Sequence, residues 1–345
     1  PMPPTTRATL IEVANVANTS KTSVSRYFGP ERHKLSPALQ ARIKQAADAL
    51  HYQPNLMARG LKGGGSRLLG MLVADIRNPF SVAIVHGVEV AARKHGYALI
   101  VCNTDNDPSL EQRHLASLAA YQVEGLVVNA AGQPQQLLQT IMRSGLPLVL
   151  IDREVGEISA PVIGLDNELA IDMALNHLSH QGYRCVLYVS EAPEQASARQ
   201  ERLQRFQQQS ASLGLDNAIL TSLEEQEAIP ALRDFIQENQ GVPCAVLCAN
   251  GNATLAMTRC FQHLEVAMGE VGLIGIDELD WCELVPPGIT TLAQPTDAIG
   301  SAAVTYLLHQ TLPSKAAKEV QHHHPPVLIP RGSTQLIGPS AHLSP

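Results

Sequence analysis

From Leu68 onward, short apolar runs alternate with helical stretches, and this alternation is the strongest constraint on the fold. The helical stretches include residues 81–95, 109–121, 168–181, 194–213 and 252–263. Strands that alternate with helices in this way form parallel sheets covered by crossover helices. Because seven strand-like runs share about 270 residues, we predict a doubly wound α/β core with two lobes. The predicted strands are residues 68–75, 98–103, 125–130, 147–152, 185–190, 244–250 and 271–277.

Polar residues stand at the ends of these runs. In parallel sheets, ligands bind beyond the carboxyl ends of the strands. Any one of these residues could instead cap a turn or a helix, but their recurrence in both predicted lobes favours a binding cleft. The candidates are Asp75, Asn103, Asn129, Asp152, Arg153, Ser190, Asn250 and Asp277.

The first 67 residues differ in charge from the rest of the chain. They hold ten Lys and Arg against three acids, a charge of +7, whereas the remainder holds fifteen against twenty-nine, a charge of −14. The whole chain therefore carries −7. A small basic head on a large acidic body predicts that only the head contacts a polyanion.

The basic head has the pattern of three short helices. Apolar residues in 9–17 have helical spacing, residues 18–20 interrupt them, and a second short helix follows through Phe28. This is the helix-turn-helix pattern, and Ser36-Pro37 begins a third helix. The second helix exposes polar side chains that suit phosphates and base edges: Lys21, Thr22, Ser23, Ser25 and Arg26.

A short linker follows the head. Pro54-Asn55 can start a helix through Leu61, and Gly63–Ser66 forms a flexible tether. Apolar residues on such a helix suit insertion between base pairs in a minor groove.

These head segments resemble a known family. Residues 9–28, Leu35-Ser36 and Tyr52-x-Pro54-Asn55-x-x-Ala58-Arg59-x-Leu61 are similar to the DNA-binding head and hinge of the LacI/GalR repressors. The resemblance implies that Lys21, Thr22 and Arg26 read bases and that Leu61 is the minor-groove wedge. Asn18 replaces the usual turn glycine, and Gly60 weakens the hinge helix by about 1 kcal/mol relative to Ala. The full set of expected DNA-binding residues is Thr9, Ser20, Lys21, Thr22, Ser23, Ser25, Arg26, Asn55, Ala58, Arg59 and Leu61.

The acidic body resembles the same family, whose core looks like a two-lobed periplasmic sugar-binding protein. The matching motifs are Asn78-Pro79-Phe80, Asp152-Arg153, Asp166-Asn167, Gly275-x-Asp277 and the segment 286–295. The resemblance implies an effector cleft lined by Phe80, Asp152, Arg153, Ser197, Arg199, Arg202, Asn250, Asp277 and Gln294.

Two departures from the family pattern concern charge. Gly251 stands where the family has an acid, and Arg205 adds a cation near Arg202. Because a desolvated carboxylate favours Arg partners, we predict an anionic effector, a sugar acid. Residues 23–36 and 58–76 are similar to 2-ketogluconate-responsive repressors, so 2-ketogluconate or gluconate is the expected effector.

The resemblance also implies an organisation and a mechanism. We expect a head (1–52), a hinge (53–66), an N-terminal lobe (67–163 with about 293–324) and a C-terminal lobe (164–292 with about 325–345). A homodimer would bind a pseudo-palindromic operator in double-stranded DNA, since the tail after Pro330 lacks the leucine heptad of tetrameric members. The effector would relieve operator binding; the alternative is a corepressor that strengthens it.

Other classes of protein are disfavoured. The sequence contains neither a dinucleotide-binding G-x-G-x-x-G after the first strand, nor a P-loop, nor a G-x-S-x-G elbow, so we expect no enzyme and no cofactor. A stand-alone sugar-acid-binding protein would not need the DNA head. We interpret His322–His324 as a solvated connector rather than a metal site, and the six cysteines as buried free thiols. With no signal peptide or membrane helix in view, we expect a cytoplasmic protein.

Overall fold

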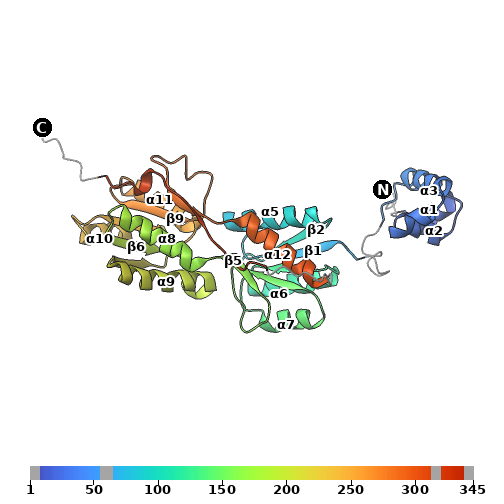
Figure 1. The fold of residues 1–345 in the computed structure, drawn as a ribbon, viewed down its shortest axis with the longest axis horizontal. Helices are drawn as coiled ribbons and strands as arrows, with labels where there is room; N and C mark the ends of the chain where they lie inside the picture. The colour runs from blue at the N-terminus through green and yellow to red at the C-terminus, as the bar shows by residue number, and fades with distance from the viewer. Residues whose placement is uncertain (1–7, 55–64, 312–319, 338–345) are drawn as a thin grey trace, which may run out of the picture. The chain divides into compact units, whose positions relative to one another are not determined.

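The structure, a computed structural model, describes residues 8–54, 65–311 and 320–337. The chain divides into two compact units, residues 1–67 and residues 68–345. The smaller unit consists of short helices, and the larger one contains two α/β lobes (Figure 1).

The smaller unit has the predicted helix-turn-helix and third helix. Thr9, Ser20 and Ser36 cap the three helices by accepting hydrogen bonds from backbone amides. Asn18 has a φ of 45° in the turn, which confirms that Asn can adopt the left-handed conformation of the usual glycine. The elements are α1 (Leu10–Val16), α2 (Lys21–Tyr27), a 3-10 helix (Pro30–Lys34) and α3 (Pro37–Ala49).

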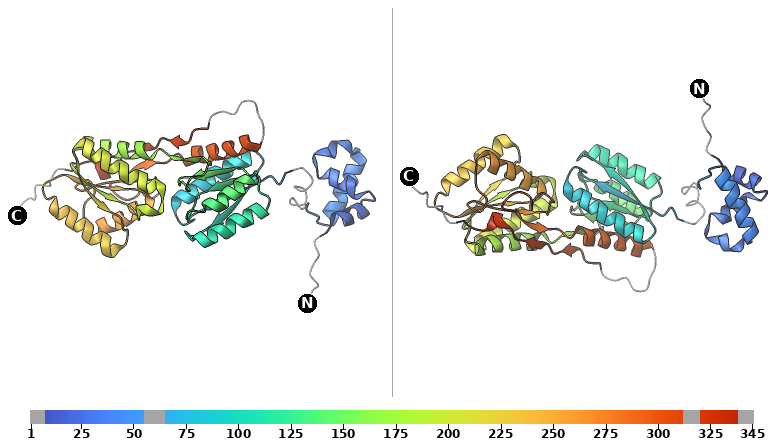
Figure 2. Two further views of the ribbon diagram at one scale, coloured as in Figure 1. Left: turned by 90° about the horizontal axis from the view of Figure 1, so that it is seen from below. Right: turned by 90° about the horizontal axis from the view of Figure 1, so that it is seen from above.

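The N-terminal lobe is built on a sheet with the strand order β11-β5-β4-β3-β1-β2, in which the described pairings are parallel. Apolar side chains of α5 and α12 pack on one face of this sheet, and those of α6 and α7 pack on the other (Figures 1 and 2). The elements are β1 (Leu68–Val73), α5 (Pro79–Lys94), β2 (Ala98–Asn103), α6 (Pro108–Ala120), β3 (Leu126–Val128), α7 (Gln135–Arg143), β4 (Leu148–Ile151), β5 (Val162–Leu165), α12 (Thr296–Thr311) and β11 (His323–His324).

The C-terminal lobe repeats this design with the order β12-β10-β9-β8-β6-β7, and only β12 among the described strands runs antiparallel. Helices α8 and α9 cover one face, and α10 and α11 cover the other. The elements are α8 (Asn167–His180), β6 (Cys185–Val189), a 3-10 helix (Pro193–Gln195), α9 (Ser197–Leu213), β7 (Asp216–Leu220), α10 (Glu225–Glu238), β8 (Cys244–Cys248), α11 (Gly251–His263), β9 (Gly272–Ile276), β10 (Thr290–Ala293), β12 (Val327–Ile329) and a 3-10 helix (Gly332–Thr334).

The chain passes between the two lobes at three places among the described residues. It crosses from β5 to α8, returns from β10 to α12, and crosses again from β11 to β12. Residues that follow β1, β3 and β4 of one sheet and β6, β8 and β9 of the other line a single pocket, so the carboxyl ends of these strands meet between the lobes. Ligands of parallel sheets bind at such strand ends.

The predicted fold class is confirmed, although the sequence analysis missed several elements. The seven predicted strands are present, with β5, β7, β10, β11 and β12 as additional members of the described sheets. The six cysteines are free and five are buried, whereas Cys102 is partly exposed. The interpretation of His322–His324 as a solvated connector is wrong in part, because β11 pairs with β5 and His324 is buried.

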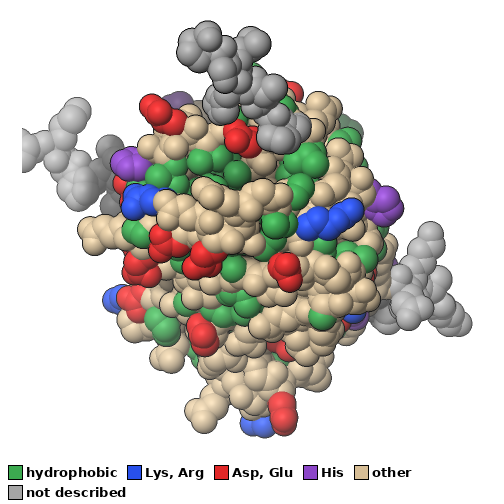
Figure 3. Space-filling view, turned by 90° about the vertical axis from the view of Figure 1, so that its left-hand side faces the viewer, with side chains coloured by type: hydrophobic (Ala, Val, Ile, Leu, Met, Phe, Trp, Pro, Cys, Tyr) green, Lys and Arg blue, Asp and Glu red, His purple; other side chains and the backbone are tan. Residues whose placement is uncertain are grey.

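The surface of the larger unit agrees with its acidic composition. Figure 3 shows the end of this unit formed by the C-terminal lobe, where acidic side chains are scattered among polar and apolar ones and no basic patch is visible. Among the described residues, no helix is both long and apolar enough to cross a bilayer.

Candidate functional site

A polar cleft lies between the two lobes of the larger unit. The space in it that a water-sized sphere can occupy is about 60 Å³, so the cleft is narrow. The lining contains eight of the nine residues expected from the sequence, together with several more. The expected ones are Phe80, Asp152, Arg153, Arg199, Arg202, Asn250, Asp277 and Gln294, and the others include Asp75, Asn78, Asn106, Asn129, Glu191 and Asn252.

On the N-terminal side, Asp152 and Arg153 follow β4. Asp152 has a φ of 66°, a left-handed conformation that is uncommon for a residue other than glycine and that clusters at functional sites. Its carboxylate lies 3.9 Å from Arg153 Nε and 3.9 Å from Arg202 Nη2. These distances exceed those of direct hydrogen bonds, so the carboxylate is only loosely paired.

Arg153 is positioned by a hydrogen bond to the loop that follows β3. Its Nη1 donates to the Ala130 carbonyl at 2.9 Å, whereas its buried Nε has no hydrogen-bond partner. The buried Glu111 carboxylate fixes this loop by accepting from the amides of Ala131 and Gly132, at 2.5 and 3.1 Å. Burial raises the pKa of Glu111, and the two amides oppose that shift.

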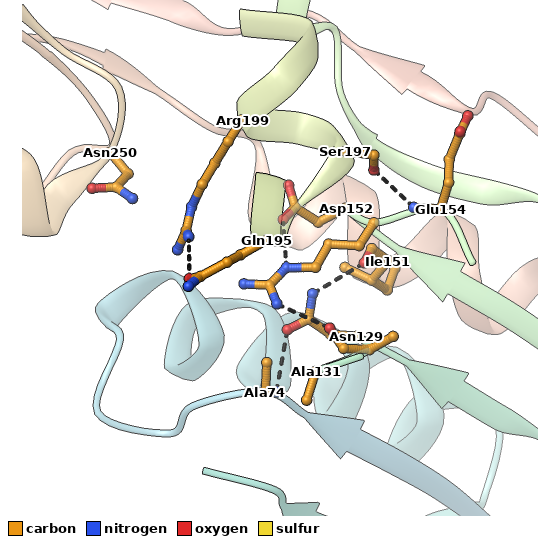
Figure 4. A network of polar contacts seen from close by, with 12 residues as sticks. Ala74, Asn129, Ala131, Ile151, Asp152, Glu154, Gln195, Ser197, Arg199 and Asn250 are labelled. Atoms are coloured by element: carbon orange, nitrogen blue, oxygen red, sulfur yellow. Dashed lines mark hydrogen bonds and ion pairs between the residues drawn. The ribbon is translucent and has the colours of Figure 1, made fainter. Parts of the chain in front are cut away.

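Asn129 braces the same edge of the N-terminal sheet. Its side chain accepts from the Ala74 amide at 3.3 Å and donates to the Ile151 carbonyl at 3.1 Å (Figure 4). It therefore joins the ends of β1 and β4 beneath the cleft. At the end of β1, Asn78 caps α5 by accepting from the Phe80 amide at 3.1 Å, which places Phe80 at the wall of the cleft.

On the C-terminal side, Arg202 of α9 is buried and makes two hydrogen bonds within its own lobe. Its Nε donates to Asn167 Oδ1 at 2.8 Å, and its Nη1 donates to the Ala249 carbonyl at 2.7 Å. Only Nη2 is directed to the other lobe, toward Asp152. Because such bonds fix a guanidinium plane, Arg202 is a rigid part of the cleft.

Asp277 follows β9 and is also fixed before any ligand binds. Its carboxylate accepts from the Gly251 amide at 3.0 Å and from Gln294 Nε2 at 2.6 Å. Burial raises the pKa of Asp277, and the nearby Arg202 charge lowers it in part. The buried Oε1 of Gln294 has no partner, which leaves one acceptor available to a ligand donor.

The sequence analysis missed Glu191, which lies one residue beyond the predicted strand 185–190. Its Oε2 is 3.0 Å from Arg199 Nη2 and accepts from Asn250 Nδ2 at 2.5 Å. Asn252 Nδ2 approaches Oε1 at 3.4 Å. The carboxylate that the sequence lacks at position 251 thus has a counterpart in the segment that follows β6.

Two expected features lie outside the cleft lining. The Ser197 hydroxyl accepts from the Glu154 amide at 2.9 Å and so joins the lobes beside the cleft (Figure 4). Arg205 does not supply a cation to the cleft, contrary to the sequence-based expectation. It forms a bidentate pair with Asp172 of α8, at 2.7 and 2.6 Å, and this pair holds its guanidinium outside the cleft.

The prediction that polar residues at the strand ends line the cleft is correct for some of these residues and wrong for others. Asp75 and Asn129 line the cleft, as predicted for strand-end side chains. Asn103 instead accepts from the Ile76 amide at 2.9 Å, and the Ser190 hydroxyl donates to the Glu191 carbonyl at 2.7 Å. The last two residues stabilise turns, which was the alternative explanation for each candidate.

In the head, α2 presents the polar side chains expected at a DNA surface. Lys21, Thr22 and Arg26 are exposed. Arg26 Nε lies 3.3 Å from Glu31 Oε2 in an exposed ion pair, a type that contributes little stability and can exchange for a phosphate or a base. Ser25 is half-buried on the same helix.

The remaining head candidates have local structural bonds or lie outside the described residues. Thr9 forms a capping box with Glu12, and the Ser20 hydroxyl accepts from the Ser23 amide at 3.1 Å. The expected hinge residues Asn55, Ala58, Arg59 and Leu61 fall outside the described part of the chain, as does Gly60.

The chemistry of the cleft suits a small polar ligand. Carboxylates and amides can bind hydroxyl groups, and three guanidinium groups can bind an anion. The described residues contain no group of three His, Cys, Asp or Glu side chains arranged to hold a metal ion.

Comparisons with known proteins agree over nearly the whole chain. A family model described as a periplasmic binding protein-like domain matches residues 175–334. The chain is 46% identical to the HTH-type transcriptional regulator PtxS of Pseudomonas aeruginosa, over 98% of each chain. It is 34% identical to the regulator KdgR of Bacillus subtilis, over 91% of this chain and 94% of that one. The fold is similar to a lac repressor dimer bound to operator and the anti-inducer ONPF, with a TM-score of 0.80, 20% identity, and coverage of 96% and 100%.

Proposed function

The chain belongs to the LacI/GalR family of helix-turn-helix transcriptional regulators, and from that premise we propose that a sugar acid bound between its lobes controls its binding to operator DNA. The expected ligand is 2-ketogluconate or gluconate. The expected assembly is a homodimer on a pseudo-palindromic operator, because one head reads only a short half-site.

The observation that carries the ligand proposal is the presence of three arginines in one narrow cleft. Arg153, Arg199 and Arg202 all line it, and the Nε of Arg153 is buried without a hydrogen-bond partner. A buried donor of this kind carries a desolvation cost that a ligand oxygen would remove. The neighbouring Asp152 and Asp277 are suited to sugar hydroxyls, so the set as a whole fits a polyhydroxylated anion.

The route from ligand to DNA follows from the connections between the lobes. A ligand that contacts Asp152 and Arg153 on one lobe and Arg202 on the other favours one angle between the lobes over others. By linkage, it changes operator affinity only if it binds the DNA-free form and the DNA-bound form with different affinities, typically by about 1–3 kcal/mol. We propose that the DNA-free form binds the ligand more tightly, so that the sugar acid is an inducer.

The head supports the DNA part of the proposal. Lys21, Thr22 and Arg26 are exposed together on α2, the helix that enters the major groove in helix-turn-helix proteins. An arginine on this helix can bind guanine O6 and N7 in a bidentate manner.

The test begins with selection of binding sites from random duplex DNA by the full chain. The enriched sequence is expected to be pseudo-palindromic. Its affinity is then measured by gel shift with and without 2-ketogluconate, gluconate and D-glucose. Weaker operator binding with a sugar acid, and no change with glucose, supports the proposal. Stronger binding would identify a corepressor instead, and no effect of either sugar acid would contradict the ligand assignment.

A further inference from the structure

A carboxylate of the protein itself, that of Glu191, lies among several hydrogen-bond donors in the cleft. The two oxygens of Glu191 meet donors from Arg199, Asn250 and Asn252, at 3.0, 2.5 and 3.4 Å. All four residues line the cleft. One guanidinium and two amides around a carboxylate are the donor set that a ligand carboxylate would require.

Two of the three donor residues, Asn250 and Arg199, have hydrogen bonds to groups other than Glu191. Asn250 Oδ1 accepts from the Ala253 amide at 2.9 Å as the cap of α11, so its amide nitrogen must face Glu191. Arg199 Nη1 is directed toward the Ala192 carbonyl and Gln195 Oε1, both at 3.4 Å (Figure 4). Asn250 and Arg199 would therefore keep their positions if Glu191 left the subsite.

Glu191 is more exposed than its partner. The side chain of Glu191 is 28% exposed, against 13% for Arg199, and it lies in the segment that connects β6 to the next 3-10 helix. Burial lowers the pKa of Arg199, and the Glu191 charge opposes this shift. A buried guanidinium needs a counter-ion, whereas a partly exposed carboxylate can turn into solvent and be hydrated there.

We propose that Glu191 is an internal competitor in a carboxylate subsite formed by Arg199, Asn250 and Asn252, and that the carboxylate of the effector displaces it. This inference rests on the proposed function and specifies which arginine receives the acid group. Arg153 and Arg202 then face the hydroxyl-bearing part of the ligand together with Asp152.

The exchange gives the cleft a means of selecting anions. A sugar acid replaces one carboxylate by another, so Arg199 keeps a counter-ion throughout. A neutral sugar of the same size offers no charge to Arg199 and leaves Glu191 in place. Selectivity arises because the wrong ligand would have to leave a buried charge unpaired.

The test is titration calorimetry of the full chain with 2-ketogluconate, gluconate and D-glucose. Glu191→Gln removes the competing charge and keeps the shape. We expect it to tighten binding of both sugar acids by about tenfold, the effect of one charge-assisted hydrogen bond, and to change glucose binding by less than about twofold. Glu194→Gln is the matched control, since it removes the same charge from an exposed position three residues further along.

A double-mutant cycle shows whether the gain acts through Arg199. Arg199→Gln should weaken sugar-acid binding by about tenfold, and Glu191→Gln should then add no gain in that background. Unchanged or weaker sugar-acid binding in Glu191→Gln, or an equal gain for glucose, would overturn the inference. If the wild-type chain binds neither sugar acid, the proposed function fails and this inference fails with it; if it binds them and only the Glu191 effect is missing, the inference alone fails.

Discussion

The two lobes share one strand order, yet they hold their cleft residues in different ways. In the C-terminal lobe, Arg202 makes two hydrogen bonds and Asp277 accepts two, all within or beside that lobe. In the N-terminal lobe, the Asp152 carboxylate is no closer than 3.9 Å to either arginine, and Arg153 Nε has no hydrogen-bond partner. Arg202 and Asp277 therefore have hydrogen bonds before a ligand arrives, whereas the Asp152 carboxylate and Arg153 Nε are only loosely paired with each other.

This difference assigns two roles, stabilising the fold and binding the ligand, to different residues. Polar groups that are buried and fully bonded stabilise the fold, and their loss leaves unpaired partners. Polar groups that are buried and incompletely bonded gain bonds only when a ligand supplies them. We therefore expect Arg202→Ala to affect mainly folding and Arg153→Ala to affect mainly binding.

The largest expected effect is on stability, from Arg202→Ala. The substitution leaves Asp277 without its nearby positive charge and removes the donors to Asn167 and Ala249. Loss of one partner in such a buried charged network costs about 3–5 kcal/mol of unfolding free energy. Urea denaturation followed by circular dichroism measures it; a loss below about 1 kcal/mol would show that this lobe is not preorganised as described.

Arg153→Ala is expected to have the opposite profile. Its one hydrogen bond, to Ala130, contributes about 1 kcal/mol, and removal of an unpaired buried donor offsets part of that loss. Affinity for 2-ketogluconate should fall by about tenfold, because a desolvated donor is missing from the site.

Calorimetry and urea denaturation of the same Arg153→Ala sample test this profile. Arg205→Ala is the matched control, since it removes an arginine that pairs with Asp172 outside the cleft, and it should leave affinity for the sugar acid unchanged. A stability loss in Arg153→Ala as large as that in Arg202→Ala would remove the distinction between the lobes.

The smallest expected effect is on the pH dependence of stability, from Asp277→Asn. Because burial raises the pKa of Asp277 above its ordinary value of 3.8, the folded state binds this proton more tightly than the unfolded state does. Its contribution to stability is therefore complete below pH 3.8 and is lost as the pH rises through the raised value. Asp277→Asn should reduce that loss, and urea midpoints measured across the acidic range would contradict the account if both proteins had the same slope.

The sequence was sufficient to predict the fold because its strongest signals are local. The apolar runs of β1, β4, β6 and β8 are buried on both faces and have the composition of parallel strands. β7 was missed because Asp216–Leu220 lies at the sheet edge, where its polar and partly exposed residues give no apolar run. Edge strands are not buried on both faces, so they need no run of apolar residues by which they could be recognised in the sequence.

The site was harder to predict, because side-chain direction depends on tertiary packing. Arg202 and Arg205 are separated by one helical turn, yet one faces Asn167 and Ala249 and the other faces Asp172. Glu191 could have been found from the sequence, because it lies two residues after the buried strand β6 and directly after Ser190, which was a candidate. Its ion pair with Arg199 could not be inferred, since it depends on how the segment after β6 folds back on α9.

A crystal structure of the full chain grown with 2-ketogluconate would test the central claim most directly. The account predicts electron density for the ligand between the lobes, with its carboxylate against Arg199, Glu191 turned into solvent, and a ligand oxygen within hydrogen-bond distance of Arg153 Nε. An empty cleft at saturating ligand, or a ligand bound with its carboxylate away from all three arginines, would contradict it.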